Sequence, residues 1–221
     1  MPRAEAAELA MLGLHAEAGS QDDVTGLVRL ASIETLIAPI ILPALTQVLA
    51  QHQGLNVEIL SSAATVNLDR HDADLALRLV RPERGHLVVR QIGSLGIGLY
   101  GPAGNDMPKR FVTWPDQEAV RTLLNWSRAF GADRAPRLSV NTLAGQIEAV
   151  ARGVGIAVLP HVLARREGLN LVADRLPDGA RMTLPIFLAI HADLAHSRRV
   201  RTVANCLVRT MNTRRAEIAE P

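Results

Sequence analysis

The chain contains few of the residues that redox and stacking chemistry require. Its 221 residues include one cysteine, Cys206, one lysine, Lys109, and only 3% aromatic residues. A single cysteine forms no internal disulfide and has no neighbours for a zinc site, so we expect a reducing compartment and a small core role for Cys206. Such a low aromatic content counts against a stacking surface for single-stranded nucleic acid.

Net charge and long apolar runs are also scarce. The formal net charge is +2 and the arginines are scattered, which gives little basis for holding DNA phosphates. The longest apolar run, residues 36–45, is short and contains Pro39 and Pro43, unlike a membrane span. Residues 1–23 carry early acids and no continuous apolar stretch, unlike a secretory signal. We therefore expect a soluble, cytoplasmic protein with no membrane contact.

What the chain does have is an ordinary globular composition with alternating strand and helix patterns. Hydrophobic residues make up 48% and charged residues 21%. The length suits one large domain or two small lobes. Short runs of branched apolar residues alternate with helical patterns, which predicts an α/β fold with a mostly parallel sheet.

One strand-to-helix pattern occurs twice, as "VRLASIETLIAPIILPAL" at 28–45 and "PRLSVNTLAGQIEAVARG" at 136–153. Each places Arg-Leu in a strand, ends it at small hydroxyl or amide residues, and starts a helix. Ligands of such sheets bind at the carboxyl ends of strands, where helix N-termini favour an anionic group. Plain helix capping by the hydroxyls is the alternative. The candidate ligand contacts are Ser32, Thr35, Asn141 and Thr142.

Glu34 bears on the ligand, because an acid at this helix start would repel an anion if it pointed inward. It therefore either faces solvent or indicates an amino group on the ligand.

Two short segments lead into apolar strands. Asp74 starts the run "DLALRL", and Gly153 and Gly155 precede "IAVLP". Asp74 has no visible partner carboxylate or base, so we interpret it as a turn acid that accepts backbone N–H groups, not as a catalytic acid. We expect the glycines to form the equivalent turn before the strand in the second half of the chain.

The sequence contains little that is typical of a catalytic or metal-binding motif. No H-E-x-x-H, G-x-S-x-G or phosphate-loop pattern occurs. His191, Asp193 and His196 have spacings that do not bring all three to one helical face. His161 lies at a predicted element end, where a histidine that faces solvent or caps is common. We therefore expect no enzyme, no catalytic residue, no metal and no cofactor.

Four stretches follow one another over most of residues 26–210: "GLVRLAS", "LDRHDADLALRL", "VNTLAGQIEAVARGVGIAVLP" and "LAIHADLAHSRRVRTVANCL". In this order and spacing they resemble the effector-binding domain of LysR-type transcriptional regulators. The resemblance implies a two-lobed fold like that of type 2 periplasmic binding proteins, with the ligand in a cleft between the lobes.

The resemblance also implies a division of the chain. Residues 26–98 and 189–221 would form lobe I, residues 99–188 lobe II, and residues 1–25 a remnant of a linker helix and hinge. The implied ligand-binding residues are Ser32, Thr35, Ser61 or Ser62, Asn141 and Thr142.

The function implied is small-molecule sensing in a homo-oligomeric regulator, with a carboxylate or an amino acid as effector. DNA would be bound only through a helix-turn-helix domain that this sequence does not contain. Either the chain is a sensor cut from a longer regulator, or it is a reading frame that has lost its DNA-binding part. A stand-alone cytoplasmic solute-binding protein of the same fold is the alternative function.

Overall fold

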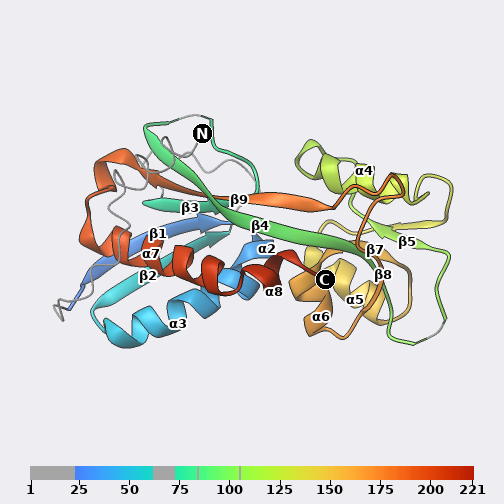
Figure 1. Cartoon of the computed structure of the whole chain (residues 1–221), viewed down its shortest axis with the longest axis horizontal. Coiled ribbons are helices and arrows are strands. Elements are labelled where there is room, and N and C mark those ends of the chain that lie inside the picture. Colours follow the sequence, from blue (N-terminus) through green and yellow to red (C-terminus); the bar gives the residue numbers. More distant parts are fainter. Residues whose placement is uncertain (1–22, 62–72, 84, 105) are drawn as a thin grey trace. The chain divides into compact units, whose positions relative to one another are not determined.

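The computed structural model describes residues 23–61, 73–83, 85–104 and 106–221, so most of the linker-helix remnant expected within residues 1–25 lies outside the described part. The chain forms two compact units (Figure 1). Unit 1 comprises Met1–Gly93 and Ile186–Thr213, and unit 2 comprises Ser94–Pro185 and Arg214–Pro221. The last eight residues therefore belong to unit 2, whereas the predicted division places them in the first lobe.

The sheet of unit 1 is built around β1 (Gly26–Ser32). This strand pairs in parallel with β2 (Leu55–Ser61) on one side and β3 (Leu75–Arg78) on the other. Beyond β3 lies β9 (Thr183–His191), which runs antiparallel to it. The expected parallel pairing holds for β1, β2 and β3, whereas β9, which returns from far along the chain, adds an antiparallel strand beside β3.

One helical run follows β1 directly. It consists of α2 (Glu34–Leu36), a π-helical turn (Ile37–Ile41) and α3 (Leu42–Gln51). Pro39 lies in the widened turn, where the missing N–H of proline disfavours regular α-helical bonding.

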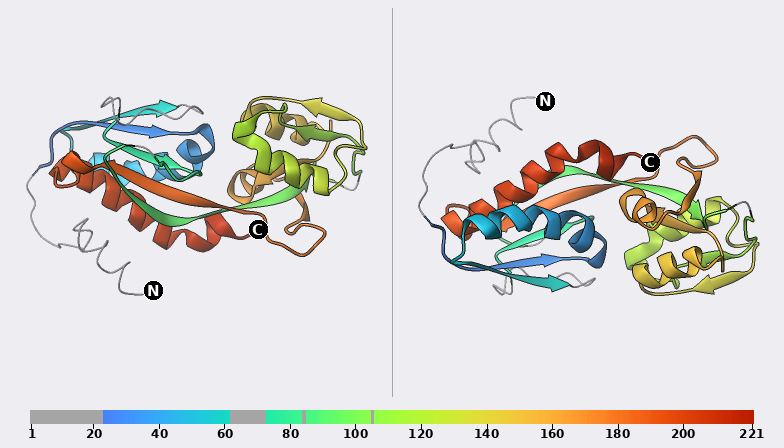
Figure 2. Two further views of the ribbon diagram at one scale, coloured as in Figure 1. Left: turned by 90° about the horizontal axis from the view of Figure 1, so that it is seen from above. Right: turned by 90° about the horizontal axis from the view of Figure 1, so that it is seen from below.

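By length and composition the run Glu34–Gln51 is apolar enough to cross a membrane. Its buried face nevertheless packs on α7 (Arg198–Thr213), where Cys206 Sγ donates to the carbonyl of Ala44 at 2.6 Å. Burial raises the pKa of the Cys206 thiol, and the residue is 6% exposed, as expected for a core position. Figure 2 shows α3 and α7 side by side on one face of the unit 1 strands, the arrangement of a core helix.

Unit 2 has two strand groups. The long β4 (Leu87–Gly101) enters it from unit 1 and pairs antiparallel with β7 (Ala157–Pro160) and β8 (Asn170–Ala173). Next to them, β5 (Phe111–Thr113) and β6 (Arg137–Ser139) form a parallel pair.

The helices of unit 2 include α8, a short C-terminal helix that the sequence analysis did not predict. They are α4 (Arg121–Ala129) with a preceding 3-10 turn (Glu118–Val120), α5 (Leu143–Ala151), α6 (His161–Arg166) and α8 (Arg215–Ala219).

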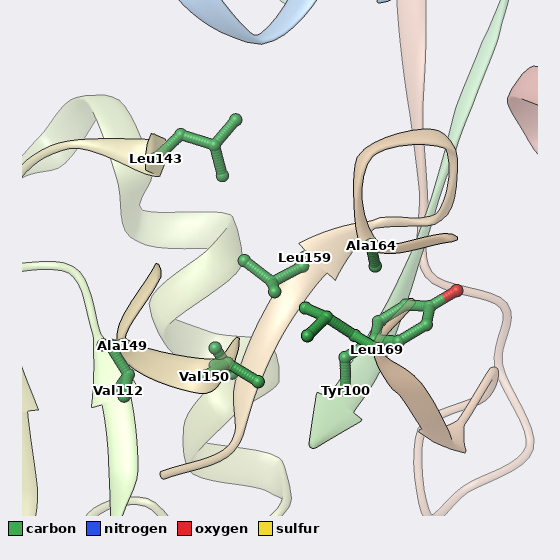
Figure 3. Packing of buried hydrophobic residues seen from close by; sticks show 9 residues of the cluster. Tyr100, Val112, Leu143, Ala149, Val150, Leu159, Ala164 and Leu169 are labelled. Atoms are coloured by element: carbon green, nitrogen blue, oxygen red, sulfur yellow. The ribbon is translucent and has the colours of Figure 1, made fainter. Parts of the chain in front are cut away.

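The core of unit 2 gathers apolar side chains from its strands and helices (Figure 3). Leu159 of β7 is fully buried and lies among side chains of α5 and α6. The partly buried ring of Trp114 packs against the same cluster. The buried members are Tyr100, Val112, Leu143, Ala149, Val150, Ala157, Leu159, Ala164 and Leu169.

Asp74, just before β3, bonds to the middle of β1. Its Oδ2 accepts the N–H of Arg29 at 2.8 Å, and its own N–H donates to the carbonyl of Arg29 at 2.9 Å. The carboxylate thus binds the neighbouring strand β1. Its role is structural, because it extends the β1–β3 pairing by one more pair of bonds.

In unit 2, Gly153 forms the turn that leads from α5 into β7, through its backbone conformation and not through a side chain. It has φ +74, and its N–H donates to Val150 O while the N–H of Val154 donates to Ala149 O. These two bonds form a Schellman motif that ends α5, and glycine is favoured at its left-handed position. Gly155 then passes close to β5, since a Cβ there would lie 2.6 Å from the carbonyl oxygen of Arg110.

Candidate ligand-binding site

In unit 1 the candidate residues meet at the carboxyl ends of two parallel strands. Ser32 and Ser61 are register partners at the ends of β1 and β2. The helical run begins two residues after Ser32, and the half-buried Thr35 lies in its first turn. Ser61 is exposed, and Ser62 lies outside the described residues. The structure therefore brings Ser32, Ser61 and a helix start to one edge of the sheet.

The side chain of Ser32 is buried in the core. It is 0% exposed, and its Oγ donates to the carbonyl of Leu77 at 3.0 Å. The N-cap of α2 is Ile33, which makes no side-chain capping bond. The interpretation of Ser32 as an N-cap is therefore wrong, because Ile33 holds that position and its apolar side chain has no group that can cap the helix.

In unit 2 the second strand-to-helix turn has its hydroxyl on the outside. Thr142 is the N-cap of α5 and its Oγ1 accepts the N–H of Gly145 at 3.2 Å, which confirms the capping interpretation for this residue. Asn141 and Thr142 are both exposed. Gln146, 1% exposed, fixes the turn from inside by donating to Val140 O at 2.9 Å.

Two further hydroxyls, which the sequence patterns did not indicate, lie at the same edge of unit 2. Thr113 and Ser139 are register partners at the ends of β5 and β6, with their hydroxyl oxygens 3.5 Å apart. The buried Nε1 of Trp114, the next residue along from β5, has no hydrogen-bond partner among the described residues. Thr113 fits the same pattern as Ser32, because "FVTW" also contains a strand that ends at a hydroxyl.

A cation lies beside the candidate edge of unit 1. Arg78 ends β3, one residue after the carbonyl that accepts from Ser32. Burial lowers the pKa of Arg78, yet a guanidinium stays charged at neutral pH. Glu34 is exposed, in agreement with the first of its two predicted roles. The positive end of a helix dipole and an arginine each favour an anionic group.

A buried tyrosine–histidine pair lies inside unit 2. Tyr100 Oη and His161 Nδ1 are 2.7 Å apart, and His161 is 3% exposed, so the expectation that it faces solvent or caps is wrong. Burial and the charge of Arg165 lower the pKa of His161 to about 4, and burial raises the pKa of Tyr100 to about 12. Both groups are neutral at pH 7, so the pair is a hydrogen-bonded part of the core.

The histidines near the end of β9 form a cluster in unit 1. Asp193 lies 3.6 Å from Nδ1 of His86 and 3.7 Å from Nδ1 of His191. His86 is an addition that sequence spacing did not indicate. Within the described residues, no group of three histidine, cysteine or acidic side chains is arranged to hold a metal ion.

Two α/β units linked by long strands, each with a helix that starts at a hydroxyl-lined strand edge, define a binding-protein class of fold. A family model described as the LysR substrate binding domain matches residues 21–212. The chain therefore belongs to the LysR substrate-binding domain family, which has the two-lobed periplasmic-binding-protein-like fold and is not a class of enzymes.

Individual relatives agree with this assignment. The "Mau operon transcriptional activator" of Paracoccus denitrificans is 29% identical over 149 residues, which are 66% of this chain and 50% of that protein. The chain thus spans about half the length of this curated relative.

Solved structures show the same fold. The regulatory domain of CrgA from Neisseria meningitidis has a TM-score of 0.69 and 18% identity, and the match covers 84% of this chain and 98% of that one. The reduced regulatory domain of OxyR2 from Vibrio vulnificus has a TM-score of 0.63 and 19% identity, covering 87% and 99%.

Proposed function

We propose that this chain is the small-molecule sensing domain of a LysR-type transcriptional regulator. The observation that carries the proposal is the repeated strand-to-helix turn, once in each unit, in a chain of the LysR substrate-binding family. The curated relative is a transcriptional activator about twice the length of the matched part. DNA recognition in a complete regulator would require a further domain.

The proposed effector contacts come from both units. In unit 1 they are the uncapped N–H groups after Ser32, together with Thr35 and Ser61 or Ser62; in unit 2 they are Asn141 and Thr142. The proposed effector is a carboxylate or an amino acid, because both helix starts and Arg78 favour a negative group. A ligand that touches both turns would occupy the cleft expected for this fold.

We further propose that effector binding changes the angle between the units, or the packing of a cytoplasmic homo-oligomer. The units are joined by β4 and β9, which pass from one to the other as extended strands. Hinge motion about a few such positions is a common switching device. In a regulator it would reposition the DNA-binding domains.

A thermal-shift screen against carboxylic acids, amino acids and aromatic acids tests the proposal. A ligand at 100 times its Kd stabilises the native state by about 2.7 kcal/mol, which is readily measured. For a compound that stabilises the protein, Thr142→Ala should reduce the stabilisation. Thr46→Ala, which removes an exposed hydroxyl from α3, should not. The assignment fails if no compound stabilises the protein or if the two variants respond alike.

A further inference from the structure

The C-terminal segment, residues 214–221, leaves the unit that holds the preceding helix. The helix α7 lies in unit 1, and its buried positions include Val200 and Leu207. After the single residue Arg214 the chain continues as α8, which belongs to unit 2. The two units are thus linked a third time, by a helical connection in addition to the strands β4 and β9.

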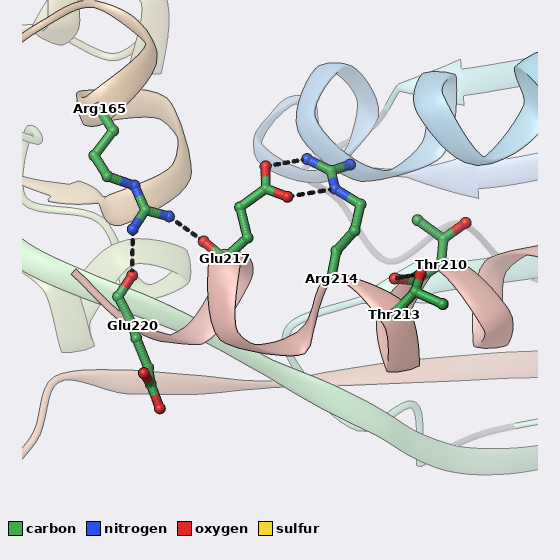
Figure 4. A network of polar contacts seen from close by, with 6 residues as sticks. All are labelled: Arg165, Thr210, Thr213, Arg214, Glu217 and Glu220. Carbon is green, nitrogen blue, oxygen red and sulfur yellow. Dashed lines mark hydrogen bonds and ion pairs between the residues drawn. The ribbon is translucent and has the colours of Figure 1, made fainter.

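The helix α8 is held on unit 2 by its own backbone carbonyls (Figure 4). Arg165 of α6 donates from Nη1 to the carbonyl of Glu220 at 2.9 Å and from Nη2 to the carbonyl of Glu217. The carbonyls that a helix leaves unpaired at its C-terminus are therefore bound by a guanidinium of unit 2, where the helix dipole favours a positive charge.

Apolar contact and a glycine complete the docking. Ile218 is 0% exposed. A Cβ at Gly96 of β4 would lie 2.2 Å from the carbonyl oxygen of Ala219, so the strand must have glycine there for α8 to approach. Before the helix, Arg214 pairs with Glu217 through Nε–Oε2 at 2.8 Å and Nη2–Oε1 at 2.5 Å. This pair shapes the turn between the two helices.

A helix as short as α8 does not persist alone in water, since helices of fewer than about 12 residues are marginal. Its structure therefore depends on docking to unit 2. From this dependence and the third connection we propose that residues 214–221 act as a latch, which restrains movement of unit 2 relative to unit 1. In the proposed sensor, this restraint sets the equilibrium between the arrangements of the two units that an effector would shift. This last step rests on the proposed function.

Local docking is tested by hydrogen exchange. The N–H groups of Ile218 and Glu220 bond to Arg214 O at 3.0 Å and Ala216 O at 2.8 Å, so their exchange reports whether α8 is formed. Arg165→Ala should accelerate their exchange about tenfold. Arg166→Ala removes the neighbouring exposed arginine of α6 and should leave it unchanged.

The restraint itself is tested without any ligand. Spin labels at Gln51→Cys and Arg134→Cys, in a Cys206→Ser background, report the distance distribution between the units. The proposal predicts a broader distribution in Arg165→Ala, and in a chain ending at Thr213, than in Arg166→Ala.

If the distance distribution is no broader in Arg165→Ala and in the chain ending at Thr213 than in Arg166→Ala, the latch proposal is wrong. This holds even if hydrogen exchange in α8 is faster in Arg165→Ala. Circular dichroism confirms that each variant is folded, and Gly96→Val replaces the shortened chain if that chain does not fold. Because no effector is used, failure of the latch and failure of the proposed sensing function give separate results.

Discussion

Unit 1 and unit 2 contain the same strand-to-helix turn but use its hydroxyl in opposite ways. In unit 1, Ser32 points into the core and bonds to Leu77 O, and the helix begins without a side-chain cap. In unit 2, Thr142 is exposed and caps α5 through the N–H of Gly145. One turn therefore presents backbone N–H groups, and the other presents a hydroxyl and the amide of Asn141.

In the proposed sensor, this difference would give the two turns separate tasks. A ligand at the unit 1 turn meets polarised N–H groups without displacing a side chain. At the unit 2 turn, it must bond to the Thr142 hydroxyl or replace its capping bond. Mutations of side chains should accordingly affect ligand binding more in unit 2 and stability more in unit 1.

The largest expected effects come from core truncations that test whether the units unfold separately. Leu30→Ala in unit 1 and Leu159→Ala in unit 2 each remove a fully buried side chain and should cost about 2–5 kcal/mol. Both tryptophans, Trp114 and Trp126, lie in unit 2, so fluorescence reports the unfolding of that unit.

Leu159→Ala should shift the fluorescence transition more than Leu30→Ala does, while circular dichroism registers both. Equal shifts of the fluorescence transition would show a single cooperative unit.

Acid should destabilise the protein through His161. The pKa of His161 is lowered from 6.5 to about 4, so between these pH values the unfolded chain binds a proton that the native imidazole does not. The stabilising contribution is complete above pH 6.5 and is lost as the pH falls to about 4, a loss on the order of 3 kcal/mol.

Denaturant titrations at several pH values, read by tryptophan fluorescence, should show a shallower pH dependence for His161→Gln than for the wild type. Identical pH dependence would contradict the buried neutral histidine.

The two turn hydroxyls should differ in their effect on stability. Ser32→Ala removes a buried donor to Leu77 O and should lower the free energy of unfolding by about 1–3 kcal/mol. Thr142→Ala removes an exposed cap and should cost about 1 kcal/mol. Chemical denaturation measures both, and a larger cost for Thr142→Ala would reverse the comparison between the turns.

Substitutions of the turn residues before β3 and β7 should have the smallest effects on stability. Asp74→Ala removes an acceptor for the N–H of Arg29, and Gly153→Ala places a Cβ at φ +74. Each substitution should lower the free energy of unfolding by about 1 kcal/mol. Asp74→Asn retains an acceptor oxygen and should cost less than Asp74→Ala. Equal losses for the two substitutions at Asp74 would contradict its role as an acceptor.

The strand and helix pattern was predictable because it depends on local periodicity. The strand at Gly26–Ser32 and the helix that ends before Gly153 were found within a few residues. The antiparallel return of β9 beside β3 was not, since pairing between segments more than 100 residues apart leaves no local signal. The short α8 was missed for a related reason, because the residues that it contacts, Arg165 and Gly96, lie far from it in the sequence.

The candidate site was predictable in position but not in detail. Sequence patterns located the two turns, yet Ser32 and Thr142 looked alike until burial separated them. The direction in which a side chain at a strand end points is set by the register with its neighbours, here Leu77 of β3. The burial of His161 could not be predicted from the sequence either, since it depends on packing against Gly96 and Gly98 of β4.

The most direct test of the central claim is an amide chemical-shift titration with a carboxylate that stabilises the protein. The informative amides are those of Glu34 and Thr35 in unit 1 and of Leu143 and Ala144 in unit 2, in the first turns of the two helices. If the ligand binds at both helix starts, both pairs should shift together and saturate at the same ligand concentration. Shifts confined to one unit, or to neither helix start, would contradict that claim.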